Sequence, residues 1–297
     1  MERVPIAILA CLVLTACADP KPDAPAATAP FSLAAAADET FESEPGIRLR
    51  YRQVGNGDPV VLLHGFTASL EAVAPLADSL ALDHRVIALD QRGHGQSTVP
   101  SDTNAFGPEM AEDVVRLLDH LGVSRADLVG HSMGAVVSAN VAARHPDRVA
   151  SVSLIAPPFF ADSVTAATEL APVVAELEGG GGFLAFFDRF APEMPDSIRS
   201  VASAEMVSAN DRAMLVGVMR TFPELSIGRE GVSGVPVPAT IVVGSIDTLR
   251  VEVRALAASW PGARYLEVEG ADHVDVFWHP ATLAAVRDQI DSPAERR

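Results

Sequence analysis

The sequence is poor in basic residues and in aromatic residues. Its 297 residues include 22 lysines and arginines against 39 aspartates and glutamates, a formal net charge of −17, and Lys21 is the only lysine. Aromatic side chains make up 5% of the chain. A chain of this charge repels phosphate backbones, and it has too few rings to build a platform on which bases stack. The composition therefore excludes a nucleic-acid-binding protein.

Cysteine is also scarce, because Cys11 and Cys17 are the only two and both lie near the N-terminus. The rest of the chain has no disulfide, no thiolate nucleophile and no cysteine-ligated metal. The sequence also contains no H-E-x-x-H motif and no G-x-G-x-x-G motif after a strand. We accordingly expect neither a metal nor a bound cofactor.

The N-terminus is typical of an exported protein. The apolar run Pro5–Leu14 is too short to span a bilayer as a helix but has the length of a signal-peptide core. The following Leu14-Thr15-Ala16-Cys17 resembles the bacterial lipobox, whose cysteine is lipidated after cleavage. Residues 1–17 are therefore expected to be a signal peptide, and lipidated Cys17 to anchor the chain to a membrane on its periplasmic or cell-surface face. Secretion as a soluble protein stays open, because Ala16-Cys17-Ala18 also fits an ordinary cleavage site.

Composition divides the remaining chain into a linker, a core and a cap. Residues 18–44 are rich in alanine and proline and lack a periodic apolar face, which predicts a linker. Residues 45–157 and 236–297 alternate short apolar runs with amphipathic segments and are expected to form one core domain. Residues 158–235 contain helical patterns without a buried strand, so we expect a helical cap inserted into that core.

The apolar runs of the core are short and continuous, as in strands buried on both faces of a mostly parallel sheet. Strands are predicted at Ile47–Val54, Pro59–Leu63, Arg85–Leu89, Ala126–Val129, Val149–Ile155, Ala239–Val243 and Tyr265–Val268. Gly55–Asp58 predicts a hairpin after the first of them. Helices are predicted at Pro108–Leu121, Ala135–Arg144 and Ala281–Ile290, and in the cap at Val164–Leu177, Phe183–Phe190 and Met206–Met219. The alternation predicts an α/β fold with helices on both faces of the sheet.

The pentapeptide Gly130-His131-Ser132-Met133-Gly134 carries the clearest chemical signal. It follows the predicted strand Ala126–Val129 and precedes a predicted helix. A G-x-S-x-G sequence at such a turn exposes the serine hydroxyl at the carboxyl edge of the sheet, beside the free N–H groups of the helix N-terminus. Ser132 is therefore the candidate nucleophile.

A serine hydroxyl needs a base to take its proton, and a histidine oriented by a carboxylate supplies one. Asp247 follows the predicted strand Ala239–Val243, and His273 follows the strand that ends near Val268. Because the carboxyl ends of parallel strands share one edge of the sheet, we expect both side chains near Ser132.

With two further segments, the sequence resembles the α/β-hydrolase family over residues 46 to 290. Leu63-His64-Gly65-Phe66 follows an early predicted strand, and Asp90–Ser97 matches the family's D-x-R-G-x-G-x-S segment. The resemblance implies a mostly parallel, eight-stranded-type sheet with helices on both faces and a helical cap insertion.

The family's roles carry over to matching positions of this sequence. The resemblance assigns Ser132 as nucleophile, Asp247 as orienting carboxylate and His273 as general base. It also implies that the backbone N–H groups of Phe66 and Met133 form the oxyanion hole, in which one donor contributes about 3–4 kcal/mol to lowering the barrier.

Some of these assignments have competitors. The other histidines considered for the base are His84, His120, His131, His145 and His279. His131 is expected to point away from the nucleophile, and the other four to be solvated. Asp272, beside the base, competes with Asp247 for the acid. His64 is expected to pin loops together.

Aromatic side chains of the cap predict the substrate pocket. Phe159, Phe160, Phe186 and Phe187 are its candidate lining. Such a pocket favours esters of apolar acids, because burying an aromatic ring contributes about 1.5–3 kcal/mol. The alternative for each ring is that it packs the cap onto the core.

The sequence therefore predicts a serine hydrolase that cleaves a small-molecule carboxylic ester through an acyl-enzyme. The same triad in this family also hydrolyses carbon–carbon bonds, lactones and thioesters, and performs cofactor-free perhydrolysis or haloperoxidation, so these reactions stay open. Epoxide hydrolases and dehalogenases of this fold use an aspartate nucleophile, against which Ser132 argues. A catalytically silent, membrane-tethered binding lipoprotein is the alternative of another class, and the complete triad argues against it.

Overall fold

A computed structural model of the chain describes residues 31–292 and contains one eight-stranded sheet. Residues 1–30 and 293–297, which include the predicted signal peptide and Cys17, lie outside the described residues. The strands are β1 (Glu39–Glu44), β2 (Ile47–Val54), β3 (Pro59–Leu63), β4 (Arg85–Leu89), β5 (Ala126–His131), β6 (Val149–Ile155), β7 (Ala239–Gly244) and β8 (Arg264–Val268). Their order in the sheet is β1-β2-β4-β3-β5-β6-β7-β8. Only the β1–β2 and β2–β4 pairs are antiparallel, which confirms the predicted mostly parallel sheet.

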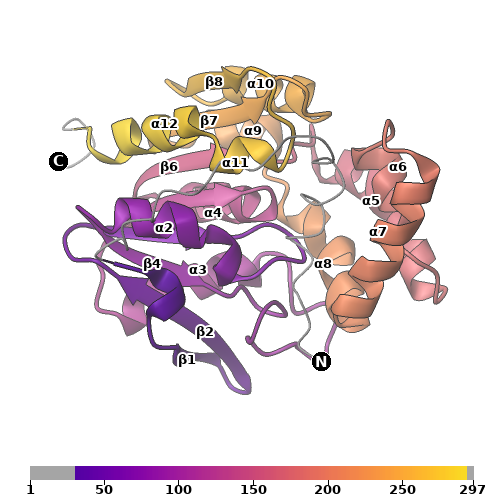
Figure 1. Cartoon of the computed structure of the whole chain (residues 1–297), viewed down its shortest axis with the longest axis horizontal. Coiled ribbons are helices and arrows are strands. Elements are labelled where there is room, and N and C mark those ends of the chain that lie inside the picture. The colour runs from indigo at the N-terminus through magenta and orange to yellow at the C-terminus, as the bar shows by residue number, and fades with distance from the viewer. Residues whose placement is uncertain (1–30, 293–297) are drawn as a thin grey trace, which may run out of the picture.

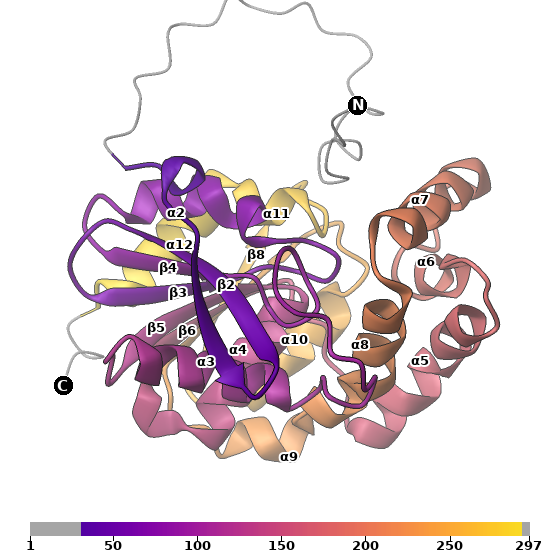
Figure 2. The same cartoon turned by 90° about the horizontal axis from the view of Figure 1, so that it is seen from below.

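Helices cover both faces of this sheet (Figure 1). One face carries η2 (Leu33–Ala35), η3 (Leu70–Val73), α2 (Ala74–Leu80), α11 (Asp275–Trp278) and α12 (Pro280–Ile290). The other carries α3 (Glu109–His120), α4 (Met133–Arg144), η4 (Pro146–Arg148), α9 (Gly228–Ser233) and α10 (Arg250–Ser259). Figure 2 shows these two layers above and below the sheet. The predicted α/β fold class is confirmed.

β3 illustrates why an unbroken apolar run forms a central strand. Val60 and Leu62 join the cluster under α2 and α12, whereas Val61 and Leu63 join the cluster under α3 and α4. Side chains alternate between the two faces of a strand, and here each face meets a helical layer. All four side chains are fully buried.

The cap is a lobe of helices beside the sheet (Figure 2). It contains α5 (Ser163–Glu178), α6 (Leu184–Phe190), α7 (Asp196–Ala209) and α8 (Arg212–Leu225), and residues 158–235 hold no strand. α5 packs along α8, and α6 contacts both α5 and α7. The single helix predicted at Met206–Met219 is wrong, because the chain breaks before Asp211. The Asp211 carboxylate accepts a hydrogen bond from the Ala213 N–H (2.7 Å) and so begins a new helix.

The ordered domain also begins earlier than predicted. Residues 33–35 form η2 and Glu39–Glu44 form β1, so the linker prediction for residues 18–44 is wrong over that part. Phe41 is the single buried side chain of β1, and Leu33 is fully buried against the layer of α2. One buried residue in a strand leaves no alternating pattern for the sequence to show.

The hairpin predicted at Gly55–Asp58 is also wrong. The hairpin lies instead between β1 and β2, at Pro45-Gly46. Gly46 has φ +83°, which suits a glycine that follows proline in a tight turn. After Gly55–Asp58 the chain crosses to the centre of the sheet, where β3 pairs in parallel with β4 and β5.

A buried carboxylate holds the loop after β4. Asp90 accepts hydrogen bonds from Arg50 Nε (2.6 Å) and from the N–H groups of Leu70 (2.7 Å) and Gln96 (2.8 Å). Burying such a charge requires paired donors of this kind. The family-like Asp90–Ser97 segment is thus a structural brace for the loops at the carboxyl edge.

Within residues 31–292, no helix is long and apolar enough to cross a bilayer.

Candidate active site

Ser132 lies at the sharp turn between β5 and α4, in a backbone conformation that non-glycine residues rarely adopt. Its φ is +52° and its ψ is −117°. A β-carbon at Gly130 would lie 2.2 Å from the carbonyl oxygen of Gly134, and one at Gly134 would lie 2.3 Å from that of Leu63. Only glycine fits at both positions, because the turn closes on its own backbone at Gly130 and packs against the end of β3 at Gly134. The Ser132 N–H donates to the carbonyl of Ile155 (2.8 Å), which fixes the turn to β6.

The three residues predicted as a triad lie together at the carboxyl edge of the sheet. His273 Nε2 is 3.0 Å from Ser132 Oγ, and His273 Nδ1 is 2.9 Å from Asp247 Oδ2. The other Asp247 oxygen, Oδ1, accepts the N–H of Leu249 (2.9 Å). The Asp247 side chain is fully buried, whereas that of His273 is 35% exposed. This line can pass a proton from the serine hydroxyl to a ring held in one orientation.

The carboxylate of Asp272, the competing candidate for the acid, binds backbone N–H groups instead of the His273 ring. Asp272 Oδ1 accepts the N–H groups of Val274 (2.8 Å) and Asp275 (2.8 Å), so it caps the start of α11. Asp247, and not Asp272, is therefore the carboxylate bonded to the His273 ring.

The other histidines are not bonded to the Ser132 hydroxyl. His145 is bonded to Glu112 (3.0 Å), and exposed His120 stacks on Phe41. His84 is buried, so the prediction that it is solvated is wrong. It lies beside the Asp291 carboxylate (3.3 Å) rather than in water.

The two predicted oxyanion donors flank the nucleophile. The Met133 N–H is the first of α4, so it has no partner within the helix. The Phe66 N–H likewise donates to no acceptor in the described part of the chain. A β-carbon at the neighbouring Gly65 would lie 3.5 Å from Ser132 Cβ, so the loop that carries Phe66 lies directly against the nucleophile.

His64 fixes this loop from behind. Its Nδ1–H donates to the carbonyl of Gly65 (2.8 Å), and its Nε2 accepts the Gln91 N–H (3.2 Å). This pattern requires the neutral ring with the proton on Nδ1. Burial lowers the pKa of His64 to about 4, which favours that form. The prediction that His64 pins loops together agrees with these bonds.

A functional role for His131 is the main feature that sequence reasoning missed. Its Nε2–H donates to the backbone carbonyl of His273 (2.9 Å), and its ring lies 5.3 Å from the His273 ring and 5.0 Å from that of Phe277. Burial and the neighbouring His273 lower the pKa of His131, so it stays neutral and keeps one ring nitrogen as an acceptor. The residue before the nucleophile thus holds the loop of the base. A polar side chain inside an otherwise apolar strand end was the available signal.

The four predicted pocket residues divide into two groups. Phe160 and Phe187 are buried and pack the cap, Phe160 against Phe222 at 6.3 Å between ring centroids. Phe159 and Phe186 are half-buried. The Phe186 ring lies 6.3 Å from that of Phe66, so the cap reaches the oxyanion loop through this pair.

The cap is also tied to the loop of the acid. Thr248 Oγ1 donates to the carbonyl of Phe190 at the end of α6 (2.7 Å). Arg189, on the same helix, pairs with Glu252 of α10 at 3.4 Å. Thr248 directly follows Asp247, so the position of α6 and the position of the acid are linked.

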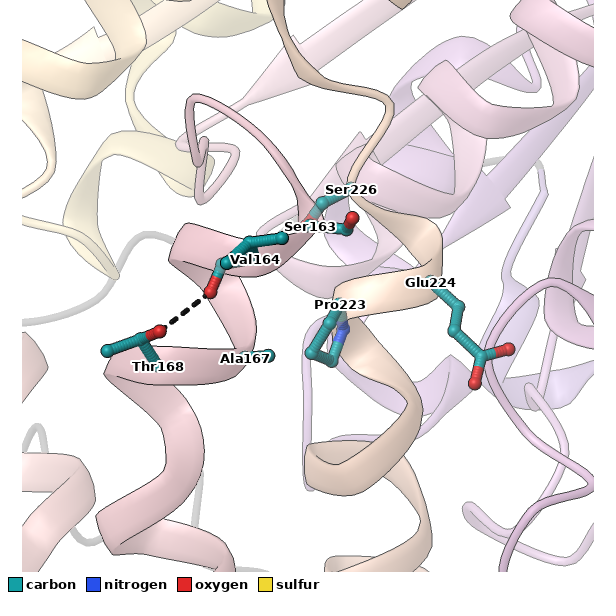
Figure 3. A pocket seen from close by; sticks show the side chains of 7 residues that line it. All are labelled: Ser163, Val164, Ala167, Thr168, Pro223, Glu224 and Ser226. Atoms are coloured by element: carbon teal, nitrogen blue, oxygen red, sulfur yellow. Dashed lines mark hydrogen bonds between the residues drawn. The ribbon is translucent and has the colours of Figure 1, made fainter.

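One hollow lies away from this constellation. It measures about 680 Å³ and opens between the start of α5 and the end of α8 (Figure 3). Its lining residues are Ser163, Val164, Ala167, Thr168, Pro223, Glu224 and Ser226. None of Ser132, Asp247 and His273 lines it, so it is not the site of the triad.

Among residues 31–292, no group of three or more histidines, cysteines or carboxylates is arranged to hold a metal.

Buried histidines make the stability of the fold dependent on pH. Burial lowers the pKa of His94 to about 3 and that of His64 to about 4. Below pH 6.5 the unfolded chain therefore binds more protons than the folded chain, and the free energy of unfolding falls. We expect a loss of about 2 kcal/mol per histidine between pH 7.5 and pH 5, measured by urea denaturation.

A substitution at His94 measures how much one buried histidine contributes to this pH dependence of the unfolding free energy. His94→Gln should lose about a third of the pH-dependent difference, because burial lowers the pKa of His64, His94 and His131 alike, whereas His120→Gln, on the surface, should keep all of it. An unfolding free energy that is the same at pH 7.5 and pH 5 would contradict the burial of neutral histidines.

Several known proteins resemble this chain in sequence. A family model for the alpha/beta hydrolase fold matches residues 58–193. The dihydrolipoyllysine-residue acetyltransferase component of the acetoin cleaving system of Cupriavidus necator is 38% identical over 162 residues, which are 50% of this chain and 43% of that protein. Epoxide hydrolase B of Mycobacterium tuberculosis is 32% identical over 243 residues, 79% of this chain and 64% of that protein. The chain thus spans less than half of the acetyltransferase component and about two thirds of the epoxide hydrolase.

Solved structures match over more of their length. The enol-lactonase from Burkholderia xenovorans superposes with a TM-score of 0.65 at 26% identity, covering 85% of this chain and all of that one. E-2-(acetamidomethylene)succinate hydrolase gives a TM-score of 0.66 at 27% identity, covering 86% of this chain and all of that one. Together with the sheet order and the turn at Ser132, these matches confirm that the chain has the α/β-hydrolase fold.

Proposed function

We propose that the protein is a serine hydrolase that cleaves a carboxylic ester of a small to medium apolar acid through an acyl-enzyme. The observation that carries the proposal is the unbroken line from Ser132 Oγ through the His273 ring to buried Asp247. Free backbone N–H groups at Phe66 and Met133 add a place for the negative charge that develops on a carbonyl oxygen.

The geometry supports a two-step reaction. Ser132 Oγ attacks the ester carbonyl carbon while its proton passes to His273 Nε2, and the N–H groups of Phe66 and Met133 stabilise the resulting oxyanion. The bond to the alcohol oxygen then breaks, and His273 returns the proton to that oxygen. Water attacks the acyl-enzyme in the second step, with its proton taken by His273, and releases the acid. Asp247 holds the ring and stabilises its charged form.

Lactones form a second candidate substrate class. A lactone is a cyclic ester, so the same two steps open its ring without any further group. The similarity to an enol-lactonase over that protein's whole length supports this candidate. Thioester, carbon–carbon and peroxide-type reactions remain alternatives for the same triad.

Replacing the nucleophile tests the proposal. In the chain of residues 18–297, Ser132→Ala should lower hydrolysis of p-nitrophenyl butyrate by at least about 10³-fold, because no other group supplies the attacking oxygen. Ser200→Ala, on the exposed face of α7, is the control and should keep full activity. A Ser132→Ala enzyme with wild-type turnover would refute the mechanism.

Chain-length preference tests the pocket. Phe186 stacks between Phe183 (4.5 Å) and Phe190 (4.7 Å) and faces Phe66, so its ring is placed to contact an acyl chain. Phe186→Ala should lower kcat/KM about tenfold for the p-nitrophenyl octanoate ester but leave the acetate ester within about threefold. Phe187→Leu, a buried cap residue, should not change the ratio. Equal losses of kcat/KM for both esters would show that Phe186 does not line the pocket.

We further propose that the chain is exported and lipidated at Cys17, on the strength of the lipobox-like Leu14-Thr15-Ala16-Cys17. When the full chain is expressed in a bacterial host, mass spectrometry should find an acylated N-terminal Cys17. Cys17→Ser should abolish the modification. A mature chain that begins elsewhere, without an acyl group, would favour the soluble secreted form.

A further inference from the structure

Exposed apolar side chains stand beside the loops that carry the acid and the base. Ile246, which precedes Asp247, is 64% exposed, and Val274, which follows His273, is 42% exposed. Trp278 is 43% exposed and lies four residues after Val274, on the same face of the short helix α11. Large apolar groups left in water at such positions indicate contact with another apolar surface.

The cap presents a second set of the same kind. Ile198 and Val201 are 37% and 56% exposed and lie three residues apart, on one face of α7. Leu184, 42% exposed, lies at the start of α6, which packs on α7. Helix α7 packs on the main hydrophobic cluster through Ala202, Met206 and Val207, whereas Ile198 and Val201 lie outside that cluster.

The elements that carry these two sets lie on the same side of the molecule. Figure 2 shows α11 and α7 both at the upper side of the view. We call Ile246, Val274, Trp278, Leu184, Ile198 and Val201 the apolar rim. Other exposed apolar residues lie elsewhere, such as Leu82, which is 52% exposed and precedes β4 at the opposite edge of the sheet.

The described chain also begins on this side. Phe31 and Leu33 pack into the cluster of α2, α11 and α12, and the first described residues lie over α2 at the upper side of Figure 2. Thirteen residues separate Cys17 from Phe31. They can span at most about 45 Å, so an anchor at Cys17 would keep this face near the membrane.

We propose that the protein docks its apolar rim on a lipid bilayer, with the exposed part of His273 turned toward the lipid, and takes from that surface an ester whose acyl chain partitions into lipid. The substrate half of this inference rests on the proposed ester hydrolysis, whereas the docking does not.

The net charge of the chain determines which lipid surfaces we expect the apolar rim to bind. The net charge is −17 and no lysine follows Lys21, so an anionic surface repels the protein. Burial of the rim is then the attractive interaction, and it operates on uncharged or zwitterionic lipid. We therefore expect binding to phosphatidylcholine vesicles and weaker binding when phosphatidylglycerol is added.

Trp278 reports the docking directly. Residues 18–297 retain every described helix and strand, and they lack both the signal peptide and the anchor. Of the two tryptophans, Trp260 is buried and Trp278 is exposed. On addition of phosphatidylcholine vesicles, the Trp278 emission should shift to shorter wavelength, and lipids brominated in the acyl chain should quench it. No shift and no quenching would overturn the proposal.

Paired variants test the rim. The double variant Ile198→Ser/Val201→Ser should weaken vesicle binding at least tenfold while it still hydrolyses water-soluble p-nitrophenyl acetate, which shows that it is folded. Leu82→Ser is the matched control and should bind like the wild type. Equal binding by all three proteins would refute the rim as the docking surface.

The two proposals fail separately. Vesicle binding without turnover of any ester would support the docking and remove the ester hydrolase. Turnover of esters without vesicle binding would support the hydrolase and remove the docking.

Discussion

The backbone of Ser132 is the constraint on which the rest of the site depends. Its positive φ is a conformation that costs about 1–3 kcal/mol for a residue with a side chain. The surrounding packing enforces it, because a β-carbon has no room at Gly130 against the backbone of Gly134, and none at Gly134 against the end of β3. The strain places the hydroxyl outside the sheet and the first N–H of α4 beside it. A nucleophile and half of an oxyanion hole thus follow from one turn.

Backbone hydrogen bonds then bring the other loops to that turn. The carbonyl of Ile155 holds the Ser132 N–H, and the carbonyl of His273 holds the His131 ring. At the outer edge, the Ser245 N–H donates to Val268 (2.8 Å), which fixes the loop of the acid against the loop of the base. The His64 and His131 rings, which hold these loops, are neutral because burial lowers their pKa. The geometry of the triad is therefore set largely by residues that do no chemistry.

Sequence patterns predicted the parts of the molecule that repeat or that are locally encoded. β3 and β4 could be found because strands buried on both faces are almost wholly apolar, and Ser132, Asp247 and His273 because each follows a predicted strand. β1 could not be found, since Phe41 is its one buried residue. The break before Asp211 was hidden because apolar residues continue on both sides of it.

Several other contacts between distant residues were not predicted from the sequence. The bond from His131 to His273 spans 142 positions and depends on how β5 and β8 are placed in the sheet. The division of the cap phenylalanines into buried rings and a ring that faces Phe66 also depends on contacts between distant residues. Phe160 and Phe187 are buried and Phe186 faces Phe66 because of how α5, α6 and α8 pack, which composition alone does not determine.

The cap and the core meet at the acid as well as at the oxyanion loop. Thr248 bonds to the end of α6, and Phe186 of that helix faces Phe66. A substrate that displaces α6 therefore acts on both sides of the nucleophile at once. This arrangement leaves His273 the most accessible member of the triad.

The central claim is that Ser132 is a nucleophile activated by His273. Its most direct test is covalent labelling by a fluorophosphonate, followed by mass spectrometry of the peptides. The account predicts one adduct per chain, on Ser132, and a labelling rate at least about 10³-fold lower in His273→Ala. No adduct, an adduct on another serine, or an unchanged rate in His273→Ala would contradict it.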